Sequence, residues 1–185
     1  LGSSIGPYLR RGIKDGHVPG PRLVAAGEYV TTTGGTWEYL KLPIEWAKAK
    51  DIFADGADGM REIVRRRIRN GANVIKLGLS KGVLDDHNQY WGDEPLLQAA
   101  GMALEEVQAA VAEAHAQHVM VAAHCIGDDS VVLALDGGVD TIEHAYGIKD
   151  DTRKRLADSQ VLVATTISQL ISHREAYEAF HYPEH

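Results

Sequence analysis

The chain has 185 residues, of which 44% are hydrophobic, 24% charged and 6% aromatic. This composition excludes a disordered tail, a collagen-like fibre and a coiled coil, and the length predicts about one globular domain. A formal net charge of -7 argues against a nucleic-acid surface, which must neutralise phosphates, and no apolar run is long enough to span a bilayer. We therefore expect small molecules or proteins as partners, with no nucleic acid and no membrane.

Cys125 is the single cysteine of the chain, so it cannot form an internal disulfide. It is compatible with a reducing compartment, and we expect a cytoplasmic location. The sequence leaves open whether the protein forms a homo-oligomer.

Short β-branched runs alternate with helical patterns along the chain. The predicted strands are 22–26, 73–79, 119–125, 139–145 and 161–168, and the predicted helices are 56–70, 102–118, 128–136 and 150–158. Such alternation is typical of βαβ units around a parallel sheet. The strands are apolar at nearly every position, as expected when both faces of a parallel strand are buried. The sequence therefore predicts an α/β fold with parallel strands adjacent in chain order.

Three predicted strands each carry one ionisable residue inside an otherwise apolar run: Lys76, His124 and His144. Burying such groups is unfavourable unless they are paired or bound to a metal. In a parallel barrel, side chains near the C-terminal strand ends converge on one mouth, where active sites lie. A hydrogen-bonded core or rim position explains any one of the three alone, but three on successive βα units favour a metal cluster.

A lysine inside a barrel strand has a second chemical use, as the Schiff-base nucleophile of an aldolase. That hypothesis predicts phosphate-binding glycine loops and does not need His124 or His144. Glu143 precedes His144, and strand alternation predicts that it points to the opposite side, as a packing residue or a supporting partner.

Five motifs span nearly the whole chain. They are Gly-Pro-Arg-Leu at 20–23, Thr-Gly-Gly at 33–35, Gly-Ala-Asn-Val-Ile-Lys at 71–76, Val-Ala-Ala-His at 121–124 and Gly-Val-Asp-Thr-Ile-Glu-His at 138–144. In these motifs the chain resembles the metal-dependent amidohydrolase superfamily, in its bacterial dipeptidase-like and imidazolonepropionase-like branch. The most specific element is the 20-residue interval from His124 to His144, with Lys76 one βα unit upstream.

The resemblance implies a (β/α)8 TIM barrel with two zinc ions. Lys76 would be the carbamylated lysine that bridges the metals at the end of barrel strand four, and His124 and His144 would bind the second metal from strands five and six. The implied enzyme uses a zinc-activated hydroxide to cleave an amide, lactam or ester bond. A small-molecule or peptide-like substrate, of dipeptidase or cyclic-amide type, is expected.

The chain also departs from the family pattern. Family members begin their site with His-x-His on strand one and end it with a strand-eight Asp that serves as general base, and the sequence contains neither, so no catalytic residue is assigned in it. A complete barrel needs about 200 to 250 residues. We therefore expect 1–185 to be a partial barrel catalytic domain without strand one, strand eight and the flanking small β domain. It should be inactive alone; a non-catalytic truncated half-barrel is the alternative.

Two positions bear on the substrate. Thr36 follows the Thr-Gly-Gly turn, where relatives often have His, and Ile126 lies two residues after His124, where relatives often have Tyr or His. Together with Ser80 and Tyr146, they are predicted to line the substrate. Thr36 and Ile126 in place of the polar residues of relatives point to a more apolar substrate than a dipeptide.

Overall fold

The computed structural model describes residues 5–36, 43–45, 51–80, 100–168, 175 and 179. Its centre is a parallel sheet of four strands in the order β1-β2-β3-β4. These strands are β1 (Val74–Gly78), β2 (Met120–Ile126), β3 (Thr141–Tyr146) and β4 (Leu162–Ala164), and helices α4 (Leu104–His115), α5 (Asp128–Gly137) and α6 (Asp150–Ala157) connect them in turn. The predicted α/β class and the parallel order of these four strands are confirmed.

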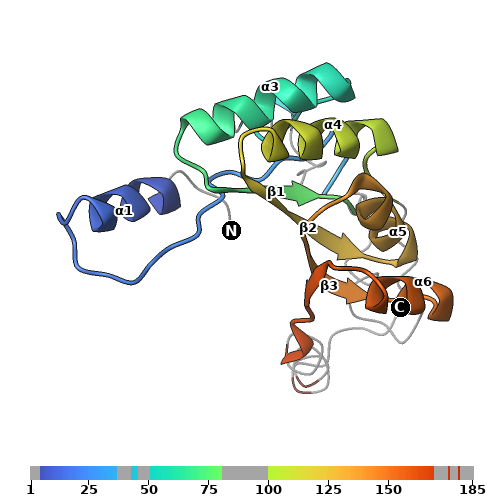
Figure 1. Ribbon diagram of the computed structural model, residues 1–185. Helices are drawn as coiled ribbons and strands as arrows, with labels where there is room; N and C mark the ends of the chain where they lie inside the picture. The colour runs from blue at the N-terminus through green and yellow to red at the C-terminus, as the bar shows by residue number, and fades with distance from the viewer. Residues whose placement is uncertain are drawn as a thin grey trace.

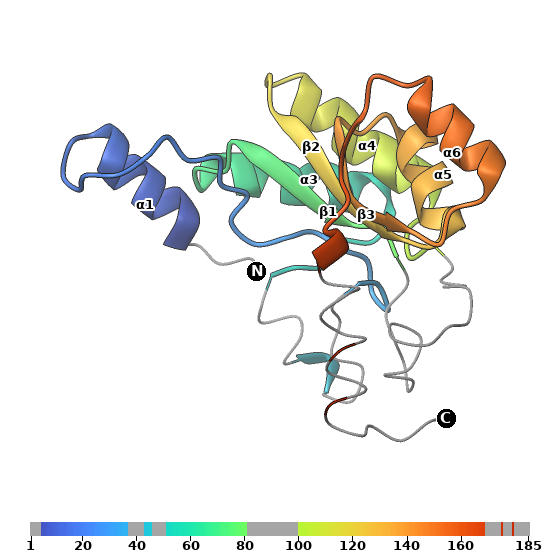
Figure 2. The ribbon, with the colours of Figure 1, turned by 90° about the horizontal axis from the view of Figure 1, so that it is seen from below.

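The helices form a layer over one face of the sheet. Helix α3 (Gly56–Arg69) contacts α4, α4 contacts α5, and α5 contacts α6. Figure 1 shows this succession of helices along the sheet, and Figure 2 shows the layer on one side of the strands. The sheet residues that point into this layer are fully buried and make up the core: Ile75, Leu77, Val121, Ala123, Cys125 and Ile142. The opposite face is left for the polar strand residues.

Packing between α4 and α5 depends on a glycine. Val107, Val111 and Ala114 form a buried face of α4 at helical spacing. A Cβ added at Gly137 would collide with the side chain of Val107, so the close approach of the two helices requires glycine there. Gly138, with φ of 78°, then ends α5 in the left-handed conformation that glycine tolerates.

Helix α1 (Ile5–Lys14) was not predicted from the sequence. Pro7 lies in its first turn, where a missing backbone N–H breaks no intrahelical hydrogen bond. The buried Pro7 ring packs against the positions of Gly27 and Gly71. Figure 1 shows α1 to one side of the helix layer, beyond the C-terminal end of α3.

The predicted strand 22–26 is wrong. Ala25 is tied to the start of β1 through Asn73, whose side chain accepts a hydrogen bond from the Ala25 N–H at 2.7 Å. The chain then turns at Gly27, with φ of 71°, and pairs with β1 only as a single bridge between Val30 and Leu77. This turn interrupts the extended run and leaves isolated bridges in place of a strand.

The other predicted boundaries differ from the structure by a few residues. The largest difference is β4, which is predicted to run over 161–168 but ends at Ala164. Thr166 has φ of 48°, which extended backbone does not allow, so the strand cannot continue through it. Among the described helices, none combines the length and apolar character needed to cross a membrane.

Candidate active site

Register places the polar strand residues on the sheet face away from the helices. Lys76 pairs with Ala122, and His124 pairs with Gly78 on one side and Glu143 on the other. In a parallel sheet, paired residues point to the same face. Lys76, His124 and Glu143 therefore share one face, because their strand neighbours point into the buried core.

Glu143 corrects a sequence-based prediction. Its carboxylate forms an ion pair with the Lys76 ammonium, and its other oxygen accepts a hydrogen bond from the Thr141 hydroxyl at 3.2 Å. The prediction that Glu143 points away from the site is therefore wrong. Regular alternation fails here because His144 and Ala145 have φ of 76° and 54°, in the left-handed region, and the register with β2 shifts at the same place.

The two histidines lie side by side. The ring centroids of His124 and His144 are 4.6 Å apart, and the rings meet edge to face at 73°. His124 is 5% exposed. His144 is held from the other side by Thr166, whose hydroxyl lies 2.7 Å from the ring Nδ1. The structure thus brings His124, His144 and the Lys76–Glu143 pair together on one face of the sheet.

Burial controls the protonation of this cluster. It lowers the pKa of His124 to about 3, and the positive charges of His144 and Lys76 act in the same direction. The pKa of His144 is lowered by burial and by Lys76. Burial also lowers the pKa of the Lys76 ammonium to about 8. Both imidazoles are therefore neutral at pH 7, while Lys76 is a cation close to its titration range.

Cys125 follows His124 in β2 but is turned toward the helix layer. Burial raises the pKa of its thiol to about 12, so the reactive thiolate is not formed near neutral pH. Cys125 is a core residue of the structure, not a nucleophile.

The donor set can be tested against a divalent metal. Two neutral imidazoles in contact are suitable nitrogen donors for zinc. The Lys76 ammonium has no lone pair and does not fit as it stands, but carbamylation would turn it into an oxygen donor. Within the described ranges, His, Cys, Asp and Glu side chains do not gather in a group of three or more that could hold a metal. The two imidazoles alone could therefore offer nitrogen donors, and Lys76 could add an oxygen donor only as a carbamate.

The four residues predicted to line the substrate fall into two groups. Thr36, Ser80 and Ile126 are almost fully buried and hydrogen-bonded to one another. The Thr36 hydroxyl donates to the Ser80 carbonyl, and the Ser80 hydroxyl accepts from the Ile126 N–H at 2.8 Å. They join the chain segments that follow β1 and end β2. Tyr146 is half-buried, and its ring lies 5.6 Å from that of His144.

Thr166 is a site residue that sequence reasoning missed. It contacts the His144 ring, and its carbonyl accepts a hydrogen bond from the Tyr146 hydroxyl at 2.7 Å. The available signal was its place at the end of a predicted strand, on the same edge as the other site residues. Thr166, two residues after the end of β4, contacts both rings.

Comparison with known proteins identifies the family of this chain. The sequence model of the Amidohydrolase family matches residues 7–183, and the chain belongs to this family. It is similar to the ochratoxinase of Aspergillus niger, with 27% identity over 183 residues, covering 90% of this chain and 36% of that protein. The resemblance inferred from the sequence motifs is confirmed.

Solved structures show the same fold. The crystal structure of the A. niger ochratoxinase has a TM-score of 0.78 and 26% identity, covering 95% of this chain and 42% of that one. A Xaa-Pro dipeptidase with bound methionine in its active site has a TM-score of 0.71 and 28% identity, covering 91% and 41%. The fold is thus that of an amidohydrolase-type barrel. This chain spans less than half the length of these relatives.

Proposed function

We propose that the full-length protein is a metal-dependent hydrolase with two zinc ions that cleaves an amide, lactam or ester bond in a small or peptide-like substrate. The observation that carries the proposal is the contact between two neutral imidazoles, His124 and His144, on the inner face of the sheet beside Lys76. We place the protein in the cytoplasm, in agreement with its single Cys125.

His124 and His144 would hold the metal, and Thr166 would orient His144 through the hydrogen bond to its other ring nitrogen. Lys76 would join them as a carbamate: its neutral amine forms a bond to the carbon of CO2 and releases one proton to water. A divalent metal bound there would supply an activated water molecule and a polarised carbonyl group. The general base is expected outside 1–185, on barrel strand eight.

Tyr146 is the lining residue best placed to touch the substrate, since it is half-buried beside His144 and its hydroxyl is anchored on Thr166. Thr36, Ser80 and Ile126 would form the buried wall behind it. A peptide-like substrate is supported by the similar proteins, which include a prolidase solved with N-methylphosphonate-L-proline. The substrates of ochratoxinase and of Xaa-Pro dipeptidases are the first to assay.

The test is metal analysis together with turnover of the full-length protein. His124→Ala and His144→Ala should each remove most bound zinc and reduce hydrolysis of dipeptide and cyclic-amide substrates by at least about a hundredfold. His17→Ala is the matched control, because His17 is exposed and lies outside the cluster. Full zinc content and activity in both cluster variants would contradict the proposal. Residues 1–185 alone should show no turnover.

A Schiff-base lysine is the second candidate, because the pKa of Lys76 is lowered to about 8 and a desolvated amine is a nucleophile. The two hypotheses differ in covalent chemistry. A Schiff-base enzyme would be trapped irreversibly by borohydride in the presence of a carbonyl substrate, with the added mass on Lys76. A carbamate would instead give a 13C NMR signal after the protein is incubated with 13C-labelled bicarbonate, and Lys76→Ala would remove this signal.

A further inference from the structure

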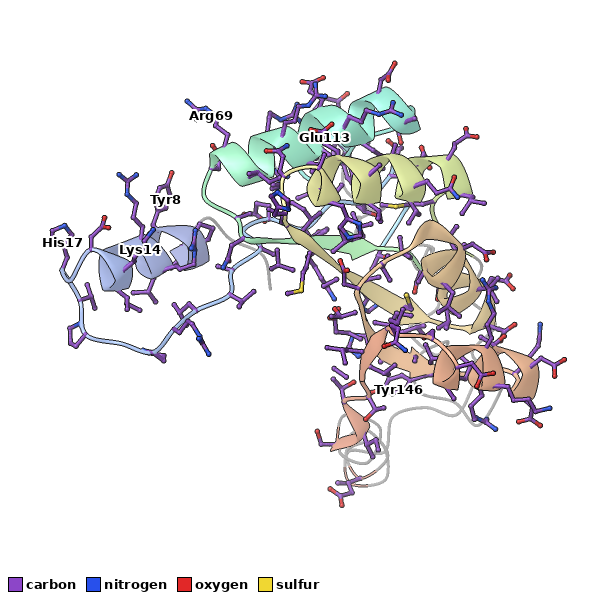
Figure 3. All side chains as sticks on the ribbon, in the orientation of Figure 1. Tyr8, Lys14, His17, Arg69, Glu113 and Tyr146 are labelled. Carbon is purple, nitrogen blue, oxygen red and sulfur yellow. The ribbon has the colours of Figure 1, made fainter. Side chains whose placement is uncertain are left out.

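A hollow lies between α1 and the C-terminal end of α3. It has a volume of about 520 Å³, within the range of small-molecule sites. Gly71, which lines it, precedes the first residue of β1, whereas Lys76 lies further along that strand. The hollow is therefore at the opposite end of the strands from the candidate active site. Figure 3 shows Arg69 at the end of α3 nearest to α1, with Tyr8 and Lys14 on α1.

The charge of the lining is unlike that of the protein. Four cationic side chains and one carboxylate face the hollow, in a chain whose net charge is -7: Arg10, Arg11, Lys14, Arg69 and Asp15. Asp15 is already paired with Arg11, at 3.6 Å. Within the described residues, Arg10, Lys14 and Arg69 have no carboxylate partner. In the part of the chain that the structure describes, these three positive charges have no counter-charge.

Helix dipoles explain only part of this arrangement. Lys14 and Arg69 lie in the last turns of α1 and α3, where a cation is favoured. The dipole does not explain why both C-terminal ends border one hollow, nor the position of Arg10 in the middle of α1. Arg10 donates from Nη2 to the Gly71 carbonyl at 3.1 Å, and its buried Nε has no acceptor among the described residues.

The base of the hollow is fixed by close packing. Pro7 is buried against Gly71, where an added Cβ would lie 3.4 Å from the Pro7 Cβ. Gly71 has φ of 96°, a conformation that other residues rarely adopt. The same turn carries the carbonyl that holds Arg10. Pro7 and the turn at Gly71 therefore form a packed floor between the cations.

We propose that this hollow binds a phosphate-bearing small molecule of nucleotide size. Arg and Lys are the side chains that recognise phosphate, and Arg does so with paired hydrogen bonds. Tyr8 stands on the rim with 66% of its surface exposed, and offers a flat apolar face to a planar group of the ligand. The sequence has no glycine-rich phosphate loop after a strand, so the phosphates would be held by side chains.

Isothermal titration calorimetry of the full-length protein tests the proposal, with ATP and inorganic pyrophosphate as separate probes at about 50 mM salt. Wild-type protein should bind ATP more tightly than pyrophosphate. The double variant Lys14→Gln and Arg69→Gln should weaken binding of both probes at least about tenfold. Tyr8→Ala should weaken ATP and leave pyrophosphate unchanged, because only the planar group contacts the ring.

Arg61→Gln combined with Arg153→Gln is the matched control, since it removes the same two charges from exposed arginines on α3 and α6. It should bind both probes like the wild type, and thermal melting should show all variants folded. The proposal is overturned if neither probe binds at millimolar concentration, or if the control weakens binding as much as the hollow variants do. Equal binding of ATP by wild type and Tyr8→Ala would overturn the assignment of a nucleotide-sized ligand. Binding that needs His124, with no effect at Lys14 and Arg69, would place the phosphate at the active site and also overturn it.

Discussion

Acidifying the metal-free protein from pH 7 to pH 5 should destabilise it through His124 by about 2 kcal/mol. In the unfolded chain this imidazole has its usual pKa of 6.5, whereas in the folded protein burial holds the pKa at about 3. The unfolded state therefore binds more protons between these two values. The stability contributed by neutral His124 is complete above about pH 6.5 and is lost as the pH falls toward about 3, by about 5 kcal/mol in all.

Urea denaturation of the full-length protein in EDTA measures this effect. His124→Asn removes the titration and keeps a polar group in the same place, so its free energy of unfolding should fall by about 2 kcal/mol less than that of the wild type between pH 7 and pH 5. His17→Asn, at an exposed position, should follow the wild type. If His124→Asn loses as much stability as the wild type, the ring is not buried in neutral form and the proposed donor state is refuted.

Two further substitutions test the scaffold around the site. Gly78→Ala should cost about 1 to 3 kcal/mol and lower the melting temperature, because a Cβ there would lie 2.7 Å from the Cβ of Thr36, which is itself fully packed; an unchanged melting temperature would contradict this packing. Arg67→Met should cost about 2 kcal/mol in urea denaturation, since the buried guanidinium holds the Asp51 carboxylate at 2.9 Å, and a cost below about 0.5 kcal/mol would show that the pair is solvated.

The sheet and its helix layer could be predicted because burial leaves a direct pattern in the sequence. The strands β1, β2 and β3 are runs of apolar residues covered on the core side, and α4 shows its buried face at helical spacing. Each of these elements was predicted to within a few residues. Local pattern suffices where a single face or run decides the burial.

At the start of the chain, proline and glycine were poor guides to secondary structure. Helix α1 contains Gly6, Pro7 and Gly12, which favour irregular structure, yet Pro7 lies in the first turn and packs against Gly71 from another part of the chain. The false strand at 22–26 has the reverse cause, because its apolar residues are followed by a turn at Gly27. A contact distant in sequence therefore decides the first case, and a local turn decides the second.

The active-site pair shows most clearly why side-chain direction could not be predicted. His144 pairs with Cys125, so a regular strand would send the imidazole into the helix layer, where Cys125 is buried. Left-handed backbone at His144 and Ala145 turns it instead toward His124, at a cost of about 1 to 3 kcal/mol for each residue. A glycine at these positions would have indicated a left-handed conformation, but His and Ala do not indicate one. Because of this backbone, the sequence could not show that Glu143 and His144 both face the site. Strain of this kind clusters at functional sites, so its presence here is an argument that the site is functional.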